Sequence, residues 1–264
     1  MKKSIIALLA LSGLAMADYV WDGTQSYSYA WDFSQESTQN NKTGVLGGTV
    51  TNTFVTESVE GVGTAIKKGS ENGKYWEVNT NTFLYDAITA ATTTNAVLTL
   101  TLDYYWTGAS WGENILHVGK DATGIAYGLS NGYLSMATGT AVDETFGASK
   151  TDLRLTANAW NTITFSLSNN EWTASLNGVT STAKALGSIT WDSAADERNK
   201  YAIGIKAPGW NSGATGLNDS GCKIANMTVS YVGYTTESPI VPEPATATLS
   251  LLALAGLAAR RRRK

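Results

Sequence analysis

Apolar residues alternate with polar ones over much of the chain between residues 27 and 232, instead of recurring every three or four positions. A period of two places the apolar side chains on one face of an extended segment, as in half-buried antiparallel strands. The alternating apolar residues are Tyr27, Tyr29, Trp31 and Phe33; Leu98, Leu100, Leu102, Tyr104 and Trp106; Ile163, Phe165 and Leu167; Trp172, Ala174 and Leu176; Tyr201, Ile203 and Ile205; and Met227, Val229 and Tyr231. The pattern predicts an all-β domain.

Turn signals separate these segments. Asn131-Gly132 and Asn177-Gly178 favour two-residue hairpins, because both residue types tolerate a positive φ. Ser168-Asn169-Asn170-Glu171 is expected to join two strands in the same way. Many short strands with regular turns indicate a β-sandwich or a barrel. We expect no long amphipathic helix, and at most a short one between Asp143 and Thr156.

The N-terminus has the three parts of a secretory signal peptide. Lys2 and Lys3 precede an apolar run from Ile5 to Leu14, and Ala15-Met16-Ala17 forms a small-x-small cleavage site. Residues 1–17 should therefore direct the chain to the Sec translocon. Signal peptidase should then cleave between Ala17 and Asp18, so that the mature protein begins at Asp18. A buried N-terminal helix is the less favoured alternative.

The C-terminus carries a second tripartite signal. Pro242, Glu243 and Pro244 are followed by an apolar run, Ala245 to Ala259, and then by five basic residues, 260–264. Fifteen residues are short against the ~20 of a full membrane span, and a basic cluster favours the cytoplasmic side. The tail resembles the PEP-CTERM sorting signal of Gram-negative bacteria. The resemblance implies processing by exosortase, a membrane-embedded transpeptidase; an ordinary membrane anchor is the alternative.

Composition narrows the possible functions of the segment between these two signals. From Asp18 to Val241 the chain carries 12 basic and 21 acidic residues, a net charge of −9. Nucleic-acid binding needs clustered Lys and Arg, so that this charge argues against it. The single Cys and single His of the chain exclude an internal disulfide framework, a thiolate zinc site and a multi-histidine metal site.

A second resemblance concerns this central segment. Leu155–Leu167 followed by Trp172–Gly178 is similar to the laminin-G/concanavalin A-like pattern, in which a Trp opens a strand and the next strand ends in Asn-Gly or Asp-Gly. Leu98–Trp106, Glu113–Gly119 and Ala225–Val232 resemble other strands of that fold. The resemblance implies a jelly-roll sandwich of two antiparallel sheets. We expect this domain over residues 18–235, a linker over 236–241 and the sorting signal over 242–264.

No catalytic constellation is apparent in the sequence. Retaining glycosidases of the concanavalin-like fold carry Glu-x-Asp-x-Glu on one strand, and this spacing does not occur here. His117 has no accompanying Gly-x-Ser-x-Gly, which favours a structural or surface role over that of a triad base. Cys222 is interpreted as a buried, inert thiol, with an intermolecular disulfide as the alternative. We therefore expect a protein that is not an enzyme.

Calcium is the one cofactor that we consider. Many laminin-G-like domains bind it through loop oxygens, and Asp103, Asp121, Asn218 and Asp219 could supply such ligands. No Asp-x-Asp-x-Asp motif accompanies them, so that the metal stays unassigned.

Aromatic residues remain as candidates for binding. Trp31, Trp106, Trp160 and Trp172 are assigned to the apolar faces and hence to the core. Trp111 and Trp210 instead lie in segments rich in Gly, Ser and Asn, where an indole can stack on a sugar ring. With Asn114 and Asn211 they are predicted to form a glycan-contacting surface at one end of the sandwich; the alternative is that they plug that end.

These observations predict an exported protein with a non-catalytic, carbohydrate-binding or adhesive domain. The sorting signal implies a precursor anchored in the inner membrane, then a place at the cell surface, in the outer membrane or in an extracellular matrix that contains exopolysaccharide. Two alternatives stay open: a glycoside hydrolase whose acids come from separate strands, and a purely structural surface protein.

Overall fold

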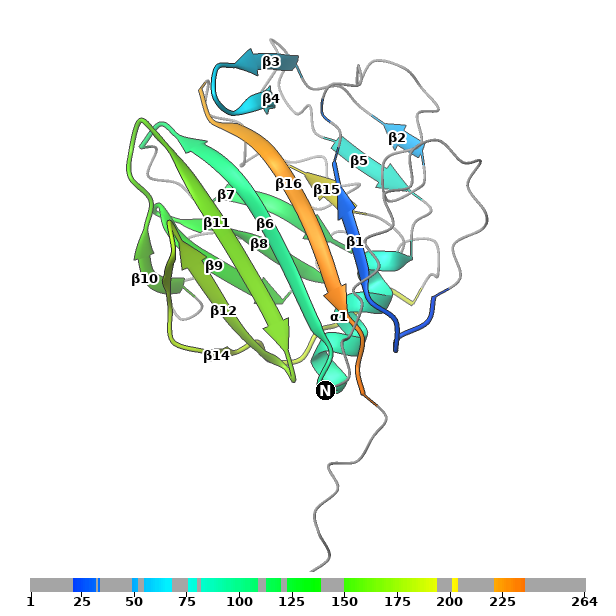
Figure 1. Cartoon of the computed structure of the whole chain (residues 1–264). Helices are drawn as coiled ribbons and strands as arrows, with labels where there is room; N and C mark the ends of the chain where they lie inside the picture. Colours follow the sequence, from blue (N-terminus) through cyan, green and yellow to red (C-terminus); the bar gives the residue numbers. More distant parts are fainter. Residues whose placement is uncertain are drawn as a thin grey trace, which may run out of the picture.

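A computed structural model describes residues 21–31, 33, 49–51, 55–67, 76–79, 82–108, 113–119, 123–138, 150–193, 201–203 and 221–235. These residues form strands in two sheets and one helix (Figure 1). In chain order the elements are β1 (Tyr27–Ala30), β2 (Thr49–Thr51), β3 (Val55–Val59), β4 (Gly63–Lys67), β5 (Trp76–Asn79), α1 (Phe83–Thr93), β6 (Val97–Trp106), β7 (Glu113–Val118), β8 (Ile125–Ser130), β9 (Tyr133–Thr138), β10 (Lys150–Arg154), β11 (Ala159–Ser168), β12 (Glu171–Leu176), β13 (Val179–Thr180), β14 (Lys184–Ala185), β15 (Tyr201–Ile203) and β16 (Lys223–Val232).

The strands pair in two antiparallel sheets. The first sheet has the order β13-β12-β11-β6-β16-β4-β3, with β1 added beside β16 and β14 beside β12. The second has the order β10-β9-β8-β7-β15-β5-β2. The β-sandwich expected from the alternation is therefore confirmed, whereas its assignment to the laminin-G/concanavalin A-like jelly rolls stays a prediction.

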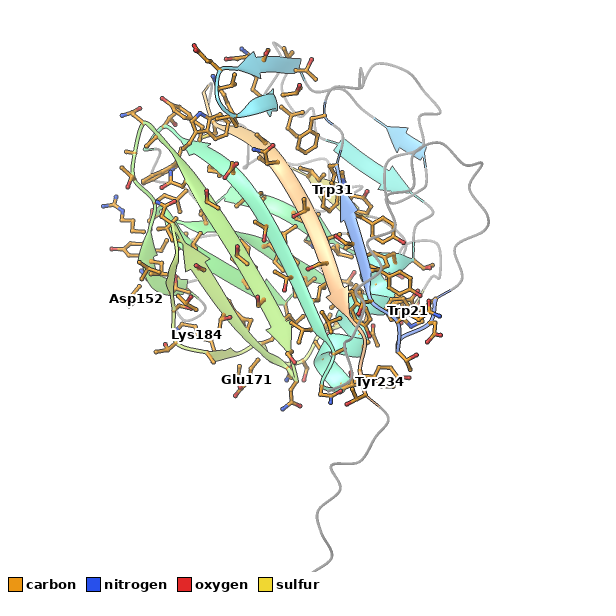
Figure 2. The ribbon with its side chains drawn as sticks, viewed as in Figure 1. Trp21, Trp31, Asp152, Glu171, Lys184 and Tyr234 are labelled. Atoms are coloured by element: carbon orange, nitrogen blue, oxygen red, sulfur yellow. The ribbon has the colours of Figure 1, made fainter. Side chains whose placement is uncertain are left out.

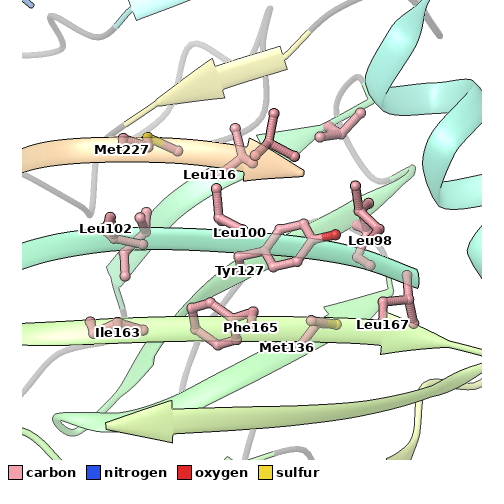
Figure 3. Close-up of a cluster of buried hydrophobic side chains, with 14 of the residues drawn as sticks. Leu98, Leu100, Leu102, Leu116, Tyr127, Met136, Ile163, Phe165, Leu167 and Met227 are labelled. Atoms are coloured by element: carbon pink, nitrogen blue, oxygen red, sulfur yellow. The ribbon is translucent and has the colours of Figure 1, made fainter. Parts of the chain in front are cut away.

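The core lies between the two sheets. Every second residue of β6, from Leu98 to Trp106, is buried, and so is every second residue of β11 from Asn161 to Leu167. In Figure 3 the leucines of β6 (Leu98, Leu100 and Leu102) and the apolar residues of β11 (Ile163, Phe165 and Leu167) lie beside Leu116, Tyr127 and Met136 of the second sheet. The alternating pattern thus marks the face of each strand that is turned to the other sheet.

All three predicted hairpin turns are confirmed. Asn131-Gly132, Asn169-Asn170 and Asn177-Gly178 have a positive φ at both residues, between 48° and 86°. They join β8 to β9, β11 to β12 and β12 to β13. Such turns match the right-handed twist of the flanking strands, which is why Asn and Gly are favoured there.

The structure has a short helix at Phe83–Thr93, a segment that the sequence did not single out. Of the segment from Asp143 to Thr156 considered for a helix, residues 143–149 lie outside the described residues, and Lys150–Arg154 forms strand β10 instead. The buried residues of α1 recur at helical spacing, and its threonines donate hydroxyl hydrogen bonds back to carbonyls four residues earlier, as Thr89 does to Tyr85 O and Thr92 to Ile88 O. Packing on β6 and β11 supports this Thr-rich segment as a helix.

Trp160 is the second correction. Trp31, Trp106 and Trp172 are buried as expected, with exposed fractions of 5%, 2% and 1%. Trp160 is only partly buried and lies on the outer face of the first sheet. It lies three positions before buried Ile163, and residues an odd number of positions apart on a strand face opposite sides.

The long strands define two ends of the sandwich. At the tail-proximal end β6 begins at Val97 and β16 ends at Val232 (Figure 1). Residues 236–264 follow this end in the sequence. At the tail-distal end β6 finishes at Trp106 and β16 begins at Lys223. Nine steps along a strand separate these ends by about 30 Å.

The two predicted targeting segments lie outside the described residues, as do Ala17, Asp18, Pro242, Glu243 and Pro244. Of the part of the chain that the structure describes, no helix has the length and apolar character that crossing a bilayer requires.

Candidate functional site

The glycan-contacting residues predicted from the sequence are not brought together by the described structure. Trp111, Trp210 and Asn211 lie outside the described residues. The backbone of Asn114 belongs to β7 and pairs with Gly128 of β8, and nothing is described of its side chain. This site therefore stays a prediction.

A different group of polar and aromatic side chains gathers on the outer face of the first sheet. We call it the tail-distal cluster; its members come from β3, β4, β6, β11 and β16 and are Glu57, Lys67, Asp103, Tyr105, Trp160, Thr162, Lys223 and Asn226. Four of these residues form a row across the sheet, because they are direct neighbours in the strand register. Trp160 pairs with Tyr105, Tyr105 with Lys223, and Lys223 with Lys67.

The aromatic part of the cluster is a pair of partly exposed rings. Tyr105 and Trp160 meet edge to face, with centroids 5.7 Å apart and planes at 64°. On the other side of Tyr105, Lys223 Nζ lies 5.5 Å from the ring centroid. The ammonium group is attracted to the electron-rich ring face. The two rings thus form a continuous aromatic surface across neighbouring strands, with the ammonium group of a lysine next to it.

Glu57 joins the two lysines of the row. Its carboxylate accepts hydrogen bonds from Lys67 and, at 2.7 Å, from Lys223. The hydrogen bonds from Lys223 and Lys67 lower the pKa of the Glu57 carboxyl from an ordinary 4.5 to about 2. Glu57 therefore carries its charge throughout the ordinary pH range and holds both lysines against the sheet.

We expect this triad to make stability pH-dependent. Because the pKa of Glu57 is lower in the folded than in the unfolded protein, its contribution is fully present above about pH 5 and is lost as the pH falls towards 2. In urea unfolding, the difference in unfolding free energy between the natural protein and Glu57→Gln should shrink over that interval. In a Lys223→Met background the same substitution should have a smaller effect. A difference that does not vary with pH would contradict the ion-pair assignment.

A β-bulge places a second polar group beside the aromatic pair. The register of β16 on β6 shifts between Ala225 and Thr228, and Asn226 has a φ of 50°. Its amide Nδ2 donates to Asp103 Oδ2 at 2.8 Å and to Val62 O at 3.2 Å. Bulges turn a side chain out of the regular alternation. Here the bulge brings an exposed amide next to a carboxylate.

Asp103 is thereby oriented by two neighbours. Its Oδ1 accepts a 2.7 Å hydrogen bond from the hydroxyl of Thr162, in addition to the bond from Asn226. Asp103 was a predicted calcium ligand, while its proposed companions Asp121, Asn218 and Asp219 lie outside the described residues. Among the residues with described positions, no three His, Cys, Asp or Glu side chains gather as a metal site would require.

His117 and Cys222 are both buried completely. His117 lies on β7 between Ala126 of β8 and Ala202 of β15. The Cys222 sulfur lies 3.5 Å from the hydroxyl oxygen of Thr107. Of the structural or surface role favoured for His117, only the structural one agrees with this burial, and Cys222 is buried as the sequence predicted.

The sequence did contain a signal for the tail-distal cluster. Trp160 is in phase with Thr162, Thr164 and Ser166, the polar residues of β11, and Tyr105 is in phase with the polar residues Asp103 and Thr101 of β6. An aromatic residue that alternates in step with the polar residues of a strand lies on the outer face of the sheet. The sequence pattern could not predict that Glu57 and Asn226 lie beside this row, because their positions depend on the order of the strands in the sheet and on a bulge.

Comparisons of the fold find distant likenesses among solved structures. One is botulinum neurotoxin type C, whose cell entry depends on interaction with two ganglioside molecules (9% identity, TM-score 0.45, covering 78% of this chain and 48% of that one). Another is a mutant Trypanosoma rangeli sialidase with trans-sialidase activity (12%, 0.47, 81% and 32%). A third is a protein of unknown function from Shewanella oneidensis (9%, 0.46, 88% and 100%).

This chain thus spans about half of the neurotoxin chain and about a third of the sialidase chain. Likenesses this distant carry no information on function. Among curated proteins, no sequence matches.

The C-terminus gives a specific match. Residues 241–264 match the family model of the PEP-CTERM protein-sorting motif, as the Pro-Glu-Pro triplet, the apolar run and the basic end indicated. This motif is recognised by exosortase and belongs to exported precursors that are anchored in the membrane and sorted to the cell surface. The chain therefore carries a PEP-CTERM protein-sorting motif behind a β-sandwich.

Proposed function

We propose that the sandwich is a non-catalytic binding domain for neutral glycans, displayed at the cell surface, and that the tail-distal cluster is its contact site. The observation that carries this proposal is the placement of Trp160 beside Tyr105 on the outer face. A sugar ring stacks on aromatic surface through its C–H groups, while its hydroxyls need fixed donors and acceptors. Asp103 and Asn226 supply such groups next to the two rings.

Charge favours a neutral ligand over an acidic polysaccharide. Within the cluster the two lysines are balanced by Glu57 and Asp103, and Lys67 and Lys223 are already engaged by Glu57. The segment from residue 18 to 241 carries a net charge of −9, which repels polyanions at long range. Nearby, β6, β11 and β16 present threonine and serine hydroxyls such as Thr101 and Thr164, which are 3.2 Å apart.

The sequence also predicts glycan contacts at one end of the sandwich, from Trp111, Asn114, Trp210 and Asn211. Trp111 lies in the connection that follows β6, and Trp210 in the one that leads to β16. Strand β6 ends and strand β16 begins at the tail-distal end. We propose these residues as additional contacts, with calcium as an optional cofactor.

Glycan binding is tested with a panel of neutral and acidic polysaccharides and residues 18–235. Once a ligand is found, Trp160→Ala and Tyr105→Ala should each weaken binding by about 1–3 kcal/mol, the loss typical of an aromatic anchor. Trp191→Ala is the matched control, since Trp191 is also partly buried but contacts Tyr85 of α1. Unchanged affinity of the Trp160 and Tyr105 variants would refute the proposed binding site. Release of reducing sugar from a polysaccharide would show that the domain is a glycan-cleaving enzyme and would refute its non-catalytic role.

A further inference from the structure

The tail-proximal end carries a group of partly exposed aromatic residues. We call it the terminal aromatic cluster; it comprises Trp21, Tyr27, Tyr29 and Tyr234. Trp21 stacks on Tyr27 with ring centroids 5.8 Å apart, and Tyr27 stacks on Tyr29 at 6.4 Å. Figure 2 shows Trp21 and Tyr234 near the end of β16. Both lie against Gly23, where a Cβ atom would be 2.6 Å from the Tyr234 ring and 3.5 Å from Trp21 Nε1.

Hydrogen bonds fasten the end of the domain to this cluster. The hydroxyl of Tyr231 donates to Gly23 O at 2.7 Å, and the backbone N–H of Tyr234 donates to the same oxygen at 3.1 Å. Asn95 then holds Thr235 twice: its Nδ2 donates to Thr235 Oγ1, and its Oδ1 accepts from Thr235 N. The point from which the chain leaves the sandwich is therefore fixed beside Trp21.

The length of the remaining chain limits how far this end can lie from a membrane. Nine residues, 236–244, separate Thr235 from Ala245, where the apolar run of the sorting motif begins. The ten steps from Thr235 to Ala245 span at most about 35 Å in a fully extended chain. In the anchored precursor the terminal aromatic cluster is thus held near the bilayer surface, at a high effective concentration.

The chemistry of the cluster suits the zwitterionic interface of a bilayer. Trp and Tyr prefer this region because their rings are apolar and their N–H and O–H groups are polar. Asp22 lies beside Trp21, and Asp86 follows one helical turn after Phe83, whose ring contacts Tyr29 at 4.9 Å. These carboxylates disfavour an anionic surface, so that the rings and not charge would provide the attraction.

We propose that in the membrane-anchored precursor the terminal aromatic cluster inserts into the headgroup region of a zwitterionic bilayer. This contact orients the sandwich with its tail-distal cluster about 30 Å away, facing outward. The inference rests on the sorting motif and on the geometry of this end, and it does not depend on glycan binding.

Fluorescence quenching tests the contact in the full-length protein reconstituted in phosphatidylcholine vesicles. Brominated phosphatidylcholine should quench part of the tryptophan emission, and Trp21→Phe should remove at least half of that quenched part. Trp160→Phe, at the opposite end, should leave it unchanged. Equal effects of the two variants, or no effect of Trp21→Phe, would overturn the proposal. Phe preserves an aromatic ring at position 21, and an unaltered urea midpoint would exclude unfolding as the cause.

A second variant distinguishes an affinity of the terminal aromatic cluster for the bilayer from the effect of the short tether. Insertion of twenty Gly and Ser residues between Thr235 and Thr236 lets the domain move away from the membrane. If the cluster has its own affinity for the interface, quenching should persist at a reduced level in this variant and decrease further with Trp21→Phe. Complete loss of quenching on insertion would show that the short tether alone brings Trp21 to the bilayer, and would overturn the proposal.

Discussion

Phe165→Ala should destabilise the sandwich by about 3–5 kcal/mol, the range measured for loss of a buried aromatic side chain. Phe165 of β11 is completely buried. Its ring meets Tyr127 of the opposite sheet edge to face, at 5.6 Å, and Trp172 of β12 at 6.5 Å. Removing it leaves a cavity between the two sheets that neither rigid sheet can close. Urea unfolding of residues 18–235 measures the loss.

Trp160→Ala is the matched control for this prediction. Trp160 lies on the same strand but faces outward, where it contacts Tyr105. Its removal opens no cavity between the sheets, so that it should cost less than half as much as Phe165→Ala. Equal losses would show that Trp160 is a core residue and would withdraw the surface assignment on which the proposed glycan site depends.

Gly124→Ala should be comparably damaging, with a loss of more than about 3 kcal/mol in the unfolding free energy, for a backbone reason. Gly124 has a φ of +83°, and a Cβ atom there would lie 1.8 Å from the carbonyl oxygen of Val118. The clash is with the backbone of β7, which cannot rotate away as a side chain could. The N–H of Gly124 also donates to Thr190 O at 2.8 Å, which would be lost if the segment moved.

Gly178→Ala isolates the contribution of backbone conformation. Gly178 has a φ of +86°, close to that of Gly124, but a Cβ atom there would meet nothing within 4 Å. Only the left-handed conformation is penalised, at about 1–2 kcal/mol. The difference between the two variants, measured by urea unfolding under identical conditions, reports the steric clash. If Gly124→Ala were no worse than Gly178→Ala, the close approach of β7 would be wrong.

Properties that repeat along the chain could be predicted from the sequence. Alternation identified β6, β11, β12 and β16, because a strand with one buried face must alternate. The Asn-Gly and Asn-Asn turns followed from the cost of positive φ for other residues. The sorting signal was recognisable because its three parts must follow one another in a fixed order, whatever the fold of the domain before them.

Contacts between distant segments were decided by the tertiary structure alone. Glu57, Tyr105, Trp160 and Lys223 come together because sheet order places β11, β6, β16, β4 and β3 side by side, and no local pattern specifies that order. The bulge that turns Asn226 towards Asp103 exists only through its pairing with β6. Helix α1 depends likewise on the strands that bury its apolar face, since its threonine-rich sequence has little intrinsic preference for a helix. Local sequence thus determined which face of each strand is apolar, whereas strand pairing determined which polar residues meet.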